Sequence, residues 1–187
     1  MPKTDGRERI LVAAEKRVRR VGFSNMSFRD IATDVGVKSA SVHYHFPTKT
    51  DLGEALIDAY ADRFLRSLTA IDQSDVNNAI KAFIKLYNDA LVLNQSICLC
   101  AMMSAEAMGL SASLNTRLMS FFRSNLTWLE ELFEQHFGDR KAALSATIIS
   151  ALEGAMIVAA ASDDRLIFDQ VSESILNSVH AECAQLS

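Results

Sequence analysis

The chain has 187 residues, of which 49% are hydrophobic and 22% charged, so it can bury a core and is not a disordered protein. It contains only two prolines and seven glycines, which is little turn punctuation for a β-sandwich or an α/β fold. We therefore expect an all-α fold.

The basic residues are concentrated near the N-terminus. Residues 1–50 hold ten Lys and Arg against five Asp and Glu, whereas residues 51–187 hold nine against eighteen. A basic head on an acidic body is expected when only the head meets a polyanion. Small basic surpluses are common in ordinary surfaces, so charge by itself leaves the question of nucleic acid open.

Apolar spacing predicts helices along the whole chain. The first covers about residues 6–21 and ends at Gly22, and the second starts at the cap Ser27 and is broken by Gly36. A short third helix should cover about 39–45, closed by Pro47, and a long fourth helix should run from 49 to about 70. Further helices are expected over about 75–94, 98–108, 111–137, 139–161 and 167–184.

Cysteine content and apolar stretches indicate the compartment. Three cysteines are too few for a disulfide framework, and no apolar stretch follows the basic start as in a secretory signal, so we expect a cytoplasmic protein. The stretch 142–162 is long enough to span a bilayer. Glu153 lies at its centre, where a charge is disfavoured, and no cluster of Lys or Arg flanks it. A helix buried in a bundle or between subunits is the better interpretation, and no membrane partner is expected.

The most informative pattern covers residues 27–52, SFRDIATDVGVKSASVHYHFPTKTDL. Two short helices joined by a tight turn with a glycine have the outline of a helix-turn-helix, whose second helix enters the major groove of DNA. That helix should be small and polar toward the bases, with Val42 and Phe46 pointing inward. The base-facing candidates are Lys38, Ser39, Ala40, Ser41 and His43.

The end of this motif resembles the signature of the tetracycline-repressor (TetR/AcrR-like) family of transcriptional regulators, an aromatic-Tyr-His-Phe run followed by a helix start with a lysine. Here the run reads VHYHFPTK over residues 42–49. The resemblance implies a DNA-binding domain over 1–50 and a ligand-binding and dimerisation domain over 51–187. His43 and Ala40 depart from the family pattern, which leaves the target sequence open but not the fold.

The same resemblance implies roles for four further residues of the head. Tyr44 corresponds to the aromatic residue that contacts phosphate, and Lys49 to the lysine at the start of the fourth helix. Ser27 and Thr48 correspond to caps whose helix N–H groups meet the DNA backbone, which suits a helix N-terminus.

Several other chemistries are less well supported. His43 and His45 are two residues apart and fall on different helix faces, so a metal pair is disfavoured, and we expect no metal or cofactor. Cys98 and Cys100 most simply pack as small hydrophobic residues, although a thiol sensor for electrophiles or oxidants stays an alternative. An enzyme with either cysteine as nucleophile and His136 or His180 as base has no local signature, so we expect no enzyme.

Methionines and aromatic residues after the head suit either a core or an adaptable apolar pocket. The family resemblance implies an inducer pocket among the fifth to eighth helices. Glu106 is the only charge in its neighbourhood, so it either orients a ligand or is a solvated exit residue. The candidate ligand-binding residues are Phe83, Tyr87, Met102, Met103, Glu106, Leu118, Phe121, Phe122, Trp128 and Met156.

The last two predicted helices suggest a homodimer. The helix over 139–161 is apolar nearly all round, which one small domain covers with difficulty. Pairing with the same helices of a twofold mate would give a four-helix interface. The expected interface residues are Leu144, Ile148, Leu152, Ala155, Ala159, Val171, Ile175 and Val179.

Together these patterns predict a cytoplasmic homodimer that binds a pseudopalindromic double-stranded DNA operator. We expect a repressor that a small apolar or amphipathic effector releases from the operator. A constitutive DNA-binding protein without an effector is the alternative.

Overall fold

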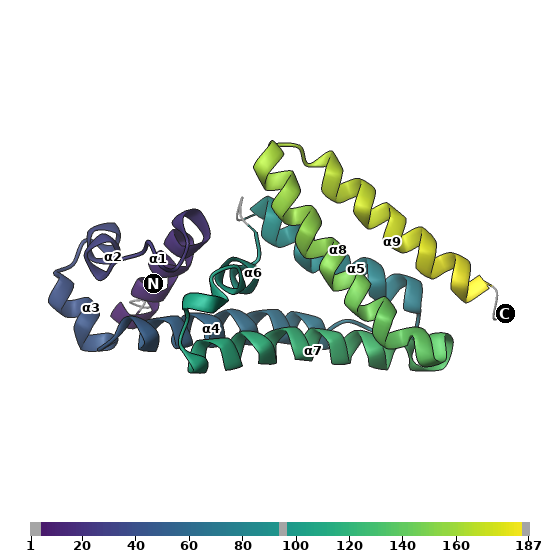
Figure 1. Ribbon diagram of the computed structural model, residues 1–187, viewed down its shortest axis with the longest axis horizontal. Coiled ribbons are helices and arrows are strands. Elements are labelled where there is room, and N and C mark those ends of the chain that lie inside the picture. Colours follow the sequence, from purple (N-terminus) through teal and green to yellow (C-terminus); the bar gives the residue numbers. More distant parts are fainter. Residues whose placement is uncertain (1–4, 94–96, 185–187) are drawn as a thin grey trace. The chain divides into compact units, whose positions relative to one another are not determined.

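The computed structural model describes residues 5–93 and 97–184, and within these ranges the chain is helical and has no strands (Figure 1). The predicted all-α fold is therefore confirmed. The helices, in chain order, are α1 (Gly6–Val21), α2 (Phe28–Val35), α3 (Ser39–His45), α4 (Lys49–Thr69), α5 (Val76–Leu93), α6 (Leu99–Ser104), α7 (Ala112–Phe137), α8 (Lys141–Ser162) and α9 (Leu166–Ala184), with the short 3₁₀ turns η1 (Ala107–Gly109) and η2 (Gly138–Arg140).

The helix bounds agree with the predicted ones except in one stretch. Residues 98–108 do not form one helix, because α6 ends at Ser104 and the chain turns before η1. Periodicity cannot detect this break, since the stretch is apolar or small at every position except Glu106. The predicted end of the fifth helix at Asn94 lies outside the described residues.

The described chain forms two compact units. Unit 1 contains residues 5–62 and 99–120, and unit 2 contains residues 63–93, 97–98 and 121–184. This division differs from the expected boundary at residue 50, because unit 1 also takes in the first part of α4, the whole of α6 and the first part of α7.

Unit 1 is built on the packing of α1 against α2, α3 and α6. Buried Ile10, Ala14 and Val18 form one stripe of α1, at the helical spacing expected for a core face. The guanidinium of Arg17 reaches across to α2, where its Nε and Nη2 atoms each lie 2.7 Å from an oxygen of Asp34. The three-helix head is thus held by an apolar core and a bidentate ion pair at its edge.

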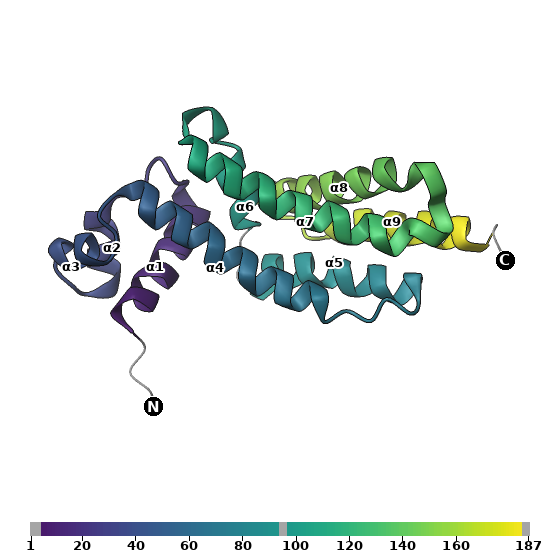
Figure 2. The ribbon, with the colours of Figure 1, turned by 90° about the horizontal axis from the view of Figure 1, so that it is seen from below.

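In unit 2, α8 packs against both α5 and α9, and the three helices lie side by side in both views (Figures 1 and 2). Residues 138–162 form the one helical stretch in the described ranges that is long and apolar enough to cross a membrane by length and composition. Its side chains Ile148, Leu152 and Met156 are buried within the unit. Core helices of soluble proteins can have the same length and composition. One face of α8 is buried in the core of unit 2.

Candidate functional site

The polar face of α3 is turned to solvent. Val42 and Phe46 are 0% and 2% exposed, and they anchor α3 in the core of unit 1. The Tyr44 side chain between them in sequence is 84% exposed. The predicted base-facing residues lie on this outward side: Lys38, Ala40, Ser41 and His43 are exposed, and Ser39 is partly exposed.

Two helices of unit 1 begin with side-chain caps. The Ser27 hydroxyl accepts a hydrogen bond from the Asp30 N–H at 3.2 Å, and the Thr48 hydroxyl accepts one from the Asp51 N–H at 3.1 Å. These bonds fix the first turns of α2 and α4, whose unpaired N–H groups and positive dipole ends suit an anion such as phosphate. Both residues therefore lie where the family resemblance implied, at exposed helix starts.

His43 lies between the two helices of the motif. Its ring meets the edge of the Phe28 ring from α2, with centroids 4.7 Å apart and planes at 63°. His43 stands where the TetR-family pattern usually has an aromatic residue. The contact shows that the imidazole still packs on α2, although His43 is exposed. Tyr44 in turn meets the edge of the His45 ring, with centroids 5.1 Å apart.

Lys49 is engaged inside unit 1. Its Nζ donates a hydrogen bond to the Ser24 carbonyl oxygen at 2.8 Å and lies 5.0 Å from the centre of the Phe23 ring. Burial lowers the pKa of the Lys49 amino group, and the nearby charge of Glu106 partly opposes that shift. The amino group therefore holds the turn between α1 and α2, and its expected role at the DNA remains a prediction.

Both carboxylate oxygens of Glu106 are bound to the same turn, a contact that its sequence neighbourhood did not indicate. Oε1 accepts a hydrogen bond from the Phe23 N–H at 2.8 Å, and Oε2 accepts one from the Ser24 N–H at 2.7 Å and another from the Ser24 hydroxyl. Burial acts to raise the pKa of Glu106, but these hydrogen bonds and the charge of Lys49 outweigh it and hold the pKa below its ordinary value. In this structure the carboxylate is bound to the turn between α1 and α2, and a role in orienting a ligand remains a prediction.

The other predicted ligand-binding residues are divided between the units. Met102, Met103 and Leu118 belong to unit 1, whereas Phe83, Tyr87, Phe121, Phe122, Trp128 and Met156 belong to unit 2. Within unit 2 the aromatic residues form one cluster: Phe83 stacks on Trp128 and touches Tyr87, with centroids 5.4 Å and 5.3 Å away. Phe64, which the sequence analysis did not single out, joins the cluster by edge contacts with Tyr87 and Phe121.

Unit 2 also buries polar groups, and of the residues that carry them only Trp128 was among the predicted ligand-binding residues. The Trp128 indole N–H, the Asn125 side-chain oxygen and the Ser145 hydroxyl are buried and find no hydrogen-bond partner among the described residues. Glu153 is 8% exposed, and burial together with the neighbouring Cys98 thiol raises the pKa of its carboxyl to about 10. Such groups are rare in protein cores, and helical periodicity marks them only as breaks in an apolar pattern.

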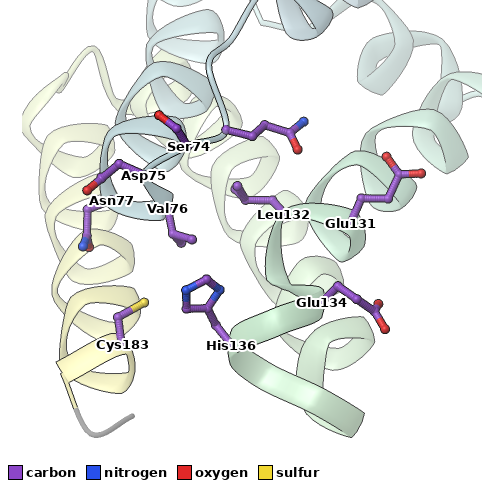
Figure 3. A pocket seen from close by; sticks show the side chains of 10 residues that line it. Ser74, Asp75, Val76, Asn77, Glu131, Leu132, Glu134, His136 and Cys183 are labelled. Carbon is purple, nitrogen blue, oxygen red and sulfur yellow. The ribbon is translucent and has the colours of Figure 1, made fainter. Parts of the chain in front are cut away.

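A separate pocket of about 810 Å³ opens in unit 2 (Figure 3). It is lined by residues 73–77 before and at the start of α5, by Glu131, Leu132, Glu134 and His136 of α7, and by Cys183 of α9. None of the predicted ligand-binding residues lines it. Burial and the charges of Asp75 and Glu182 raise the pKa of the Cys183 thiol, which keeps it protonated and weakly nucleophilic.

Two families of known proteins match the chain. The family described as "Bacterial regulatory proteins, tetR family" matches residues 10–56, which contain α2 and α3. The family described as "Transcriptional regulator LmrA/YxaF-like, C-terminal domain" matches residues 77–174, more than half of the chain. The chain belongs to the TetR family. It is a DNA-binding transcriptional regulator with a helix-turn-helix, as its motif predicted.

Solved structures and curated relatives agree with this assignment. A TetR transcriptional regulator from Legionella pneumophila is 30% identical, covers 95% of this chain and 99% of its own, and superposes with a TM-score of 0.87. A TetR-family regulator from Agrobacterium tumefaciens is 25% identical, with coverage of 92% and 96% and a TM-score of 0.86. The nucleoid occlusion factor SlmA from Photobacterium profundum is 24% identical over 165 residues, 82% of this chain and 83% of the relative.

Proteins of the TetR family dimerise, and most of the residues predicted for this contact are buried within the single chain. Ile148, Leu152, Ala155, Ala159, Ile175 and Val179 are buried within unit 2, where they pack α8 against its neighbours, and Leu144 and Val171 are half-buried. Burial within the single chain leaves these side chains little surface for a second copy, whereas Leu144 and Val171 keep part of theirs. Their role in a dimer contact remains a prediction.

Proposed function

We propose that this chain is an effector-responsive repressor that acts in the cytoplasm and binds a pseudopalindromic DNA operator as a homodimer. In this proposal α3 of each copy enters a major groove, while the capped starts of α2 and α4 face the phosphates. The observation that carries it is the polarity of α3, which buries Val42 and Phe46 and exposes Lys38, Ser41 and Tyr44. The proposal includes no catalytic step.

DNA binding is tested with the full chain and a duplex that it selects from a random library. Fluorescence anisotropy should give two chains per duplex and an affinity that falls steeply with salt. Tyr44→Ala and Lys38→Ala should each weaken binding by about tenfold, since a good groove or phosphate contact contributes on the order of 1–3 kcal/mol. Met119→Ala, an exposed apolar residue elsewhere in unit 1, and Lys81→Ala, an exposed lysine of unit 2, are the matched controls. Failure to select any duplex at low salt would overturn the proposal.

The dimer contact is proposed to lie on the outward face of α8 and α9. This face of α8 is small and apolar, and it carries Ala143, Thr147, Ser150, Gly154, Ile157, Val158 and Ala161. Ile157 and Val158 are 47% and 51% exposed in the single chain, and a Cβ added at Gly154 would meet no atom outside its own helix backbone within 4 Å. Small residues let two helices approach closely, so a second copy of the chain is the occupant we propose.

Gly154→Leu separates folding from dimerisation. A Cβ at this position meets open space, and leucine favours a helix over glycine, so we expect the variant to unfold at the same temperature or higher. It should sediment as a monomer, because the added side chain fills the space that the second copy needs. Gly109→Leu, also in open space but outside this face, should stay dimeric. A dimeric Gly154→Leu variant would contradict the proposed face.

The effector is proposed to bind in unit 2 near the aromatic cluster of Phe64, Phe83, Tyr87, Phe121 and Trp128. Stacked rings suit an apolar or amphipathic molecule, and the buried indole N–H and amide oxygen of Trp128 and Asn125 lack partners among the described side chains and backbone. A ligand that forms hydrogen bonds with these two atoms would remove the free-energy cost of burying them without partners.

A thermal-shift screen of amphipathic aromatic compounds tests this part of the proposal, because a ligand that binds only the folded state raises the unfolding temperature. True effectors should also change the emission of Trp128, the only tryptophan of the chain, and should release the selected duplex. If no compound does so while the duplex binds, the chain is the constitutive alternative. A thiol sensor is less well supported, since Cys98 and Cys100 are 1% and 0% exposed and N-ethylmaleimide should not reach them in the folded protein.

A further inference from the structure

We propose that Glu106 is a positioning residue of the DNA-binding unit, although it follows the helix-turn-helix by about sixty residues and lies outside the matched head, residues 10–56. Its carboxylate fixes the turn between α1 and α2 and thereby sets how the starts of α2 and α4 are presented to DNA. This inference rests on the proposed DNA-binding function.

The turn between α1 and α2 is held by hydrogen bonds to charged groups on both sides. Two consecutive backbone N–H groups, of Phe23 and Ser24, each donate to a different oxygen of Glu106 at 2.8 Å and 2.7 Å. The carbonyl oxygen of Ser24 accepts a hydrogen bond from Lys49 Nζ at 2.8 Å. Residue 24 is therefore held on one side by an anion and on the other by a cation, and hydrogen bonds of this charged kind are about twice as strong as neutral ones.

The turn between α1 and α2 is also closely packed against its neighbours. Gly22 has a φ of +84°, and a Cβ added there would lie 2.5 Å from Glu106 Oε1. On the other side, the buried Phe23 ring lies so close to Gly53 of α4 that a Cβ there would be 2.8 Å from the ring. Glycines at 22 and 53 thus allow the turn to fit between Glu106 and α4.

The turn is connected to the starts of both helices that are proposed to face the phosphates. Ser27, the cap of α2, follows Ser24 by three residues, and Lys49 is the first residue of α4. Both helix starts are therefore tied to the residue that Glu106 holds. The charge of Glu106 is taken up by the two N–H groups and offset by the nearby Lys49 amino group, which supports a positioning role.

Glu106→Gln tests the inference, because the amide keeps one acceptor oxygen but turns an NH₂ donor toward an N–H donor. Glu54→Gln is the matched control, since Glu54 is also a half-buried carboxylate of unit 1 but binds Arg117 at 3.1 Å and not the turn. Affinity is measured by anisotropy on the duplex selected by the wild type and on a random duplex, well below the unfolding temperature of each variant.

We expect Glu106→Gln to weaken binding to the selected duplex by about tenfold, because one charge-assisted hydrogen bond is lost. Binding to the random duplex should weaken less. Glu54→Gln should stay within about twofold of the wild type, whatever its unfolding temperature. The amide NMR signals of Phe23 and Ser24 should move upfield in Glu106→Gln, which shows that the intended bonds were lost. Unchanged affinity together with these NMR shifts would overturn the inference.

A variant that fails to fold and a wild type that binds no DNA each have a distinct meaning for the inference. If Glu106→Gln does not fold, Glu106→Asp serves as the test, because the shorter side chain keeps the charge but cannot reach both N–H groups of the turn. An affinity equal to that of the wild type would again overturn the inference. If the wild type itself selects no duplex, the proposed DNA-binding function fails. Failure of the inference alone is recognised by a wild type and a Glu106 variant that bind the selected duplex equally well.

Discussion

The indole ring of Trp128 stacks on the phenyl ring of Phe83, with centroids 5.4 Å apart and planes 11° from parallel. Phe83 comes from α5 and Trp128 from α7, and the two side chains are 0% and 6% exposed. Because the chain has a single tryptophan, its fluorescence reports on this contact without interference from other sites.

Phe83→Ala should destabilise the protein by about 3–5 kcal/mol, since it removes a large buried ring and leaves a cavity beside Trp128. Urea unfolding followed by circular dichroism measures this cost, and the folded variant should emit at longer wavelength as water reaches the indole. Phe122→Ala, on the same helix as Trp128 but only half-buried, should cost less. A Phe83→Ala cost below that of Phe122→Ala would contradict the burial of this stack.

Gly22→Ala should be more destabilising than Gly36→Ala, although both glycines have positive φ. At Gly36 (φ +74°) no atom lies within 4 Å of an added Cβ, so an alanine should cost only the backbone strain, about 1 kcal/mol. At Gly22 the backbone lies at φ 84° and ψ 162°, a region nearly restricted to glycine, and the Cβ also meets Glu106. We expect about 2–3 kcal/mol there, measured by denaturant unfolding.

The contact with Glu106 can be separated from the strain by repeating Gly22→Ala in a Glu106→Ala background. The cost of the alanine should then fall toward that of the strain alone. An unchanged cost in this background would show that Glu106 is not the obstacle.

Glu153→Gln should remove a loss of stability that the wild type suffers as the pH rises. The carboxyl ionises near 4.5 when unfolded but only at about 10 when folded, so the folded wild type holds a proton that the unfolded chain releases. The wild type therefore loses stability as the pH rises between these values, on the order of 3 kcal/mol by neutral pH, whereas glutamine cannot ionise. Unfolding free energies at about pH 5 and about pH 8 should show the variant gaining on the wild type.

The exposed Glu173 of α9 supplies the control for this experiment. Glu173→Gln should follow the pH dependence of the wild type, because an exposed carboxyl is solvated in both states. A constant difference between Glu153→Gln and the wild type across this range would mean that Glu153 is ionised in the folded protein.

Asp34→Asn should remove the ion pair that joins α1 to α2. The Arg17 guanidinium holds the pKa of the Asp34 carboxyl below its ordinary value, so the pair stabilises the fold above that ordinary value. Because Asp34 is exposed, the variant should lose no more than about 1 kcal/mol at neutral pH, a few degrees in thermal unfolding. The difference should vanish as the pH falls through the folded-state pKa, while Asp62→Asn, an exposed control on α4, should have little effect at either pH.

Local signals were sufficient to predict most of the helices and the helix-turn-helix. Caps such as Ser27, the left-handed Gly36 and the restriction before Pro47 act on neighbouring residues, so they can be recognised in the sequence alone. The exposed face of α3 could be predicted because burial of Val42 and Phe46 fixes the direction of the residues around them.

The rest depends on contacts between distant residues. Nothing near Glu106 indicates that its partners are Phe23 and Ser24, which precede it by more than eighty residues. On α8 the periodicity located an apolar stripe, but an apolar stripe looks the same whether it faces a core or a second subunit. Periodicity did not single out the outward face around Gly154, which we propose as the dimer contact, because its residues are small or polar and carry little hydrophobic signal.

The discontinuity of unit 1 bears on how regulators of this kind can be recombined. A chimera that exchanges heads at a junction near residue 56 would bring a foreign turn to the carboxylate of Glu106, or leave the native turn facing a foreign side chain. Transplanting residues 5–62 together with 99–120 would keep donor and acceptor from the same parent. Grafts designed on this boundary should therefore retain the operator preference of the donor head better than grafts cut at the end of the motif.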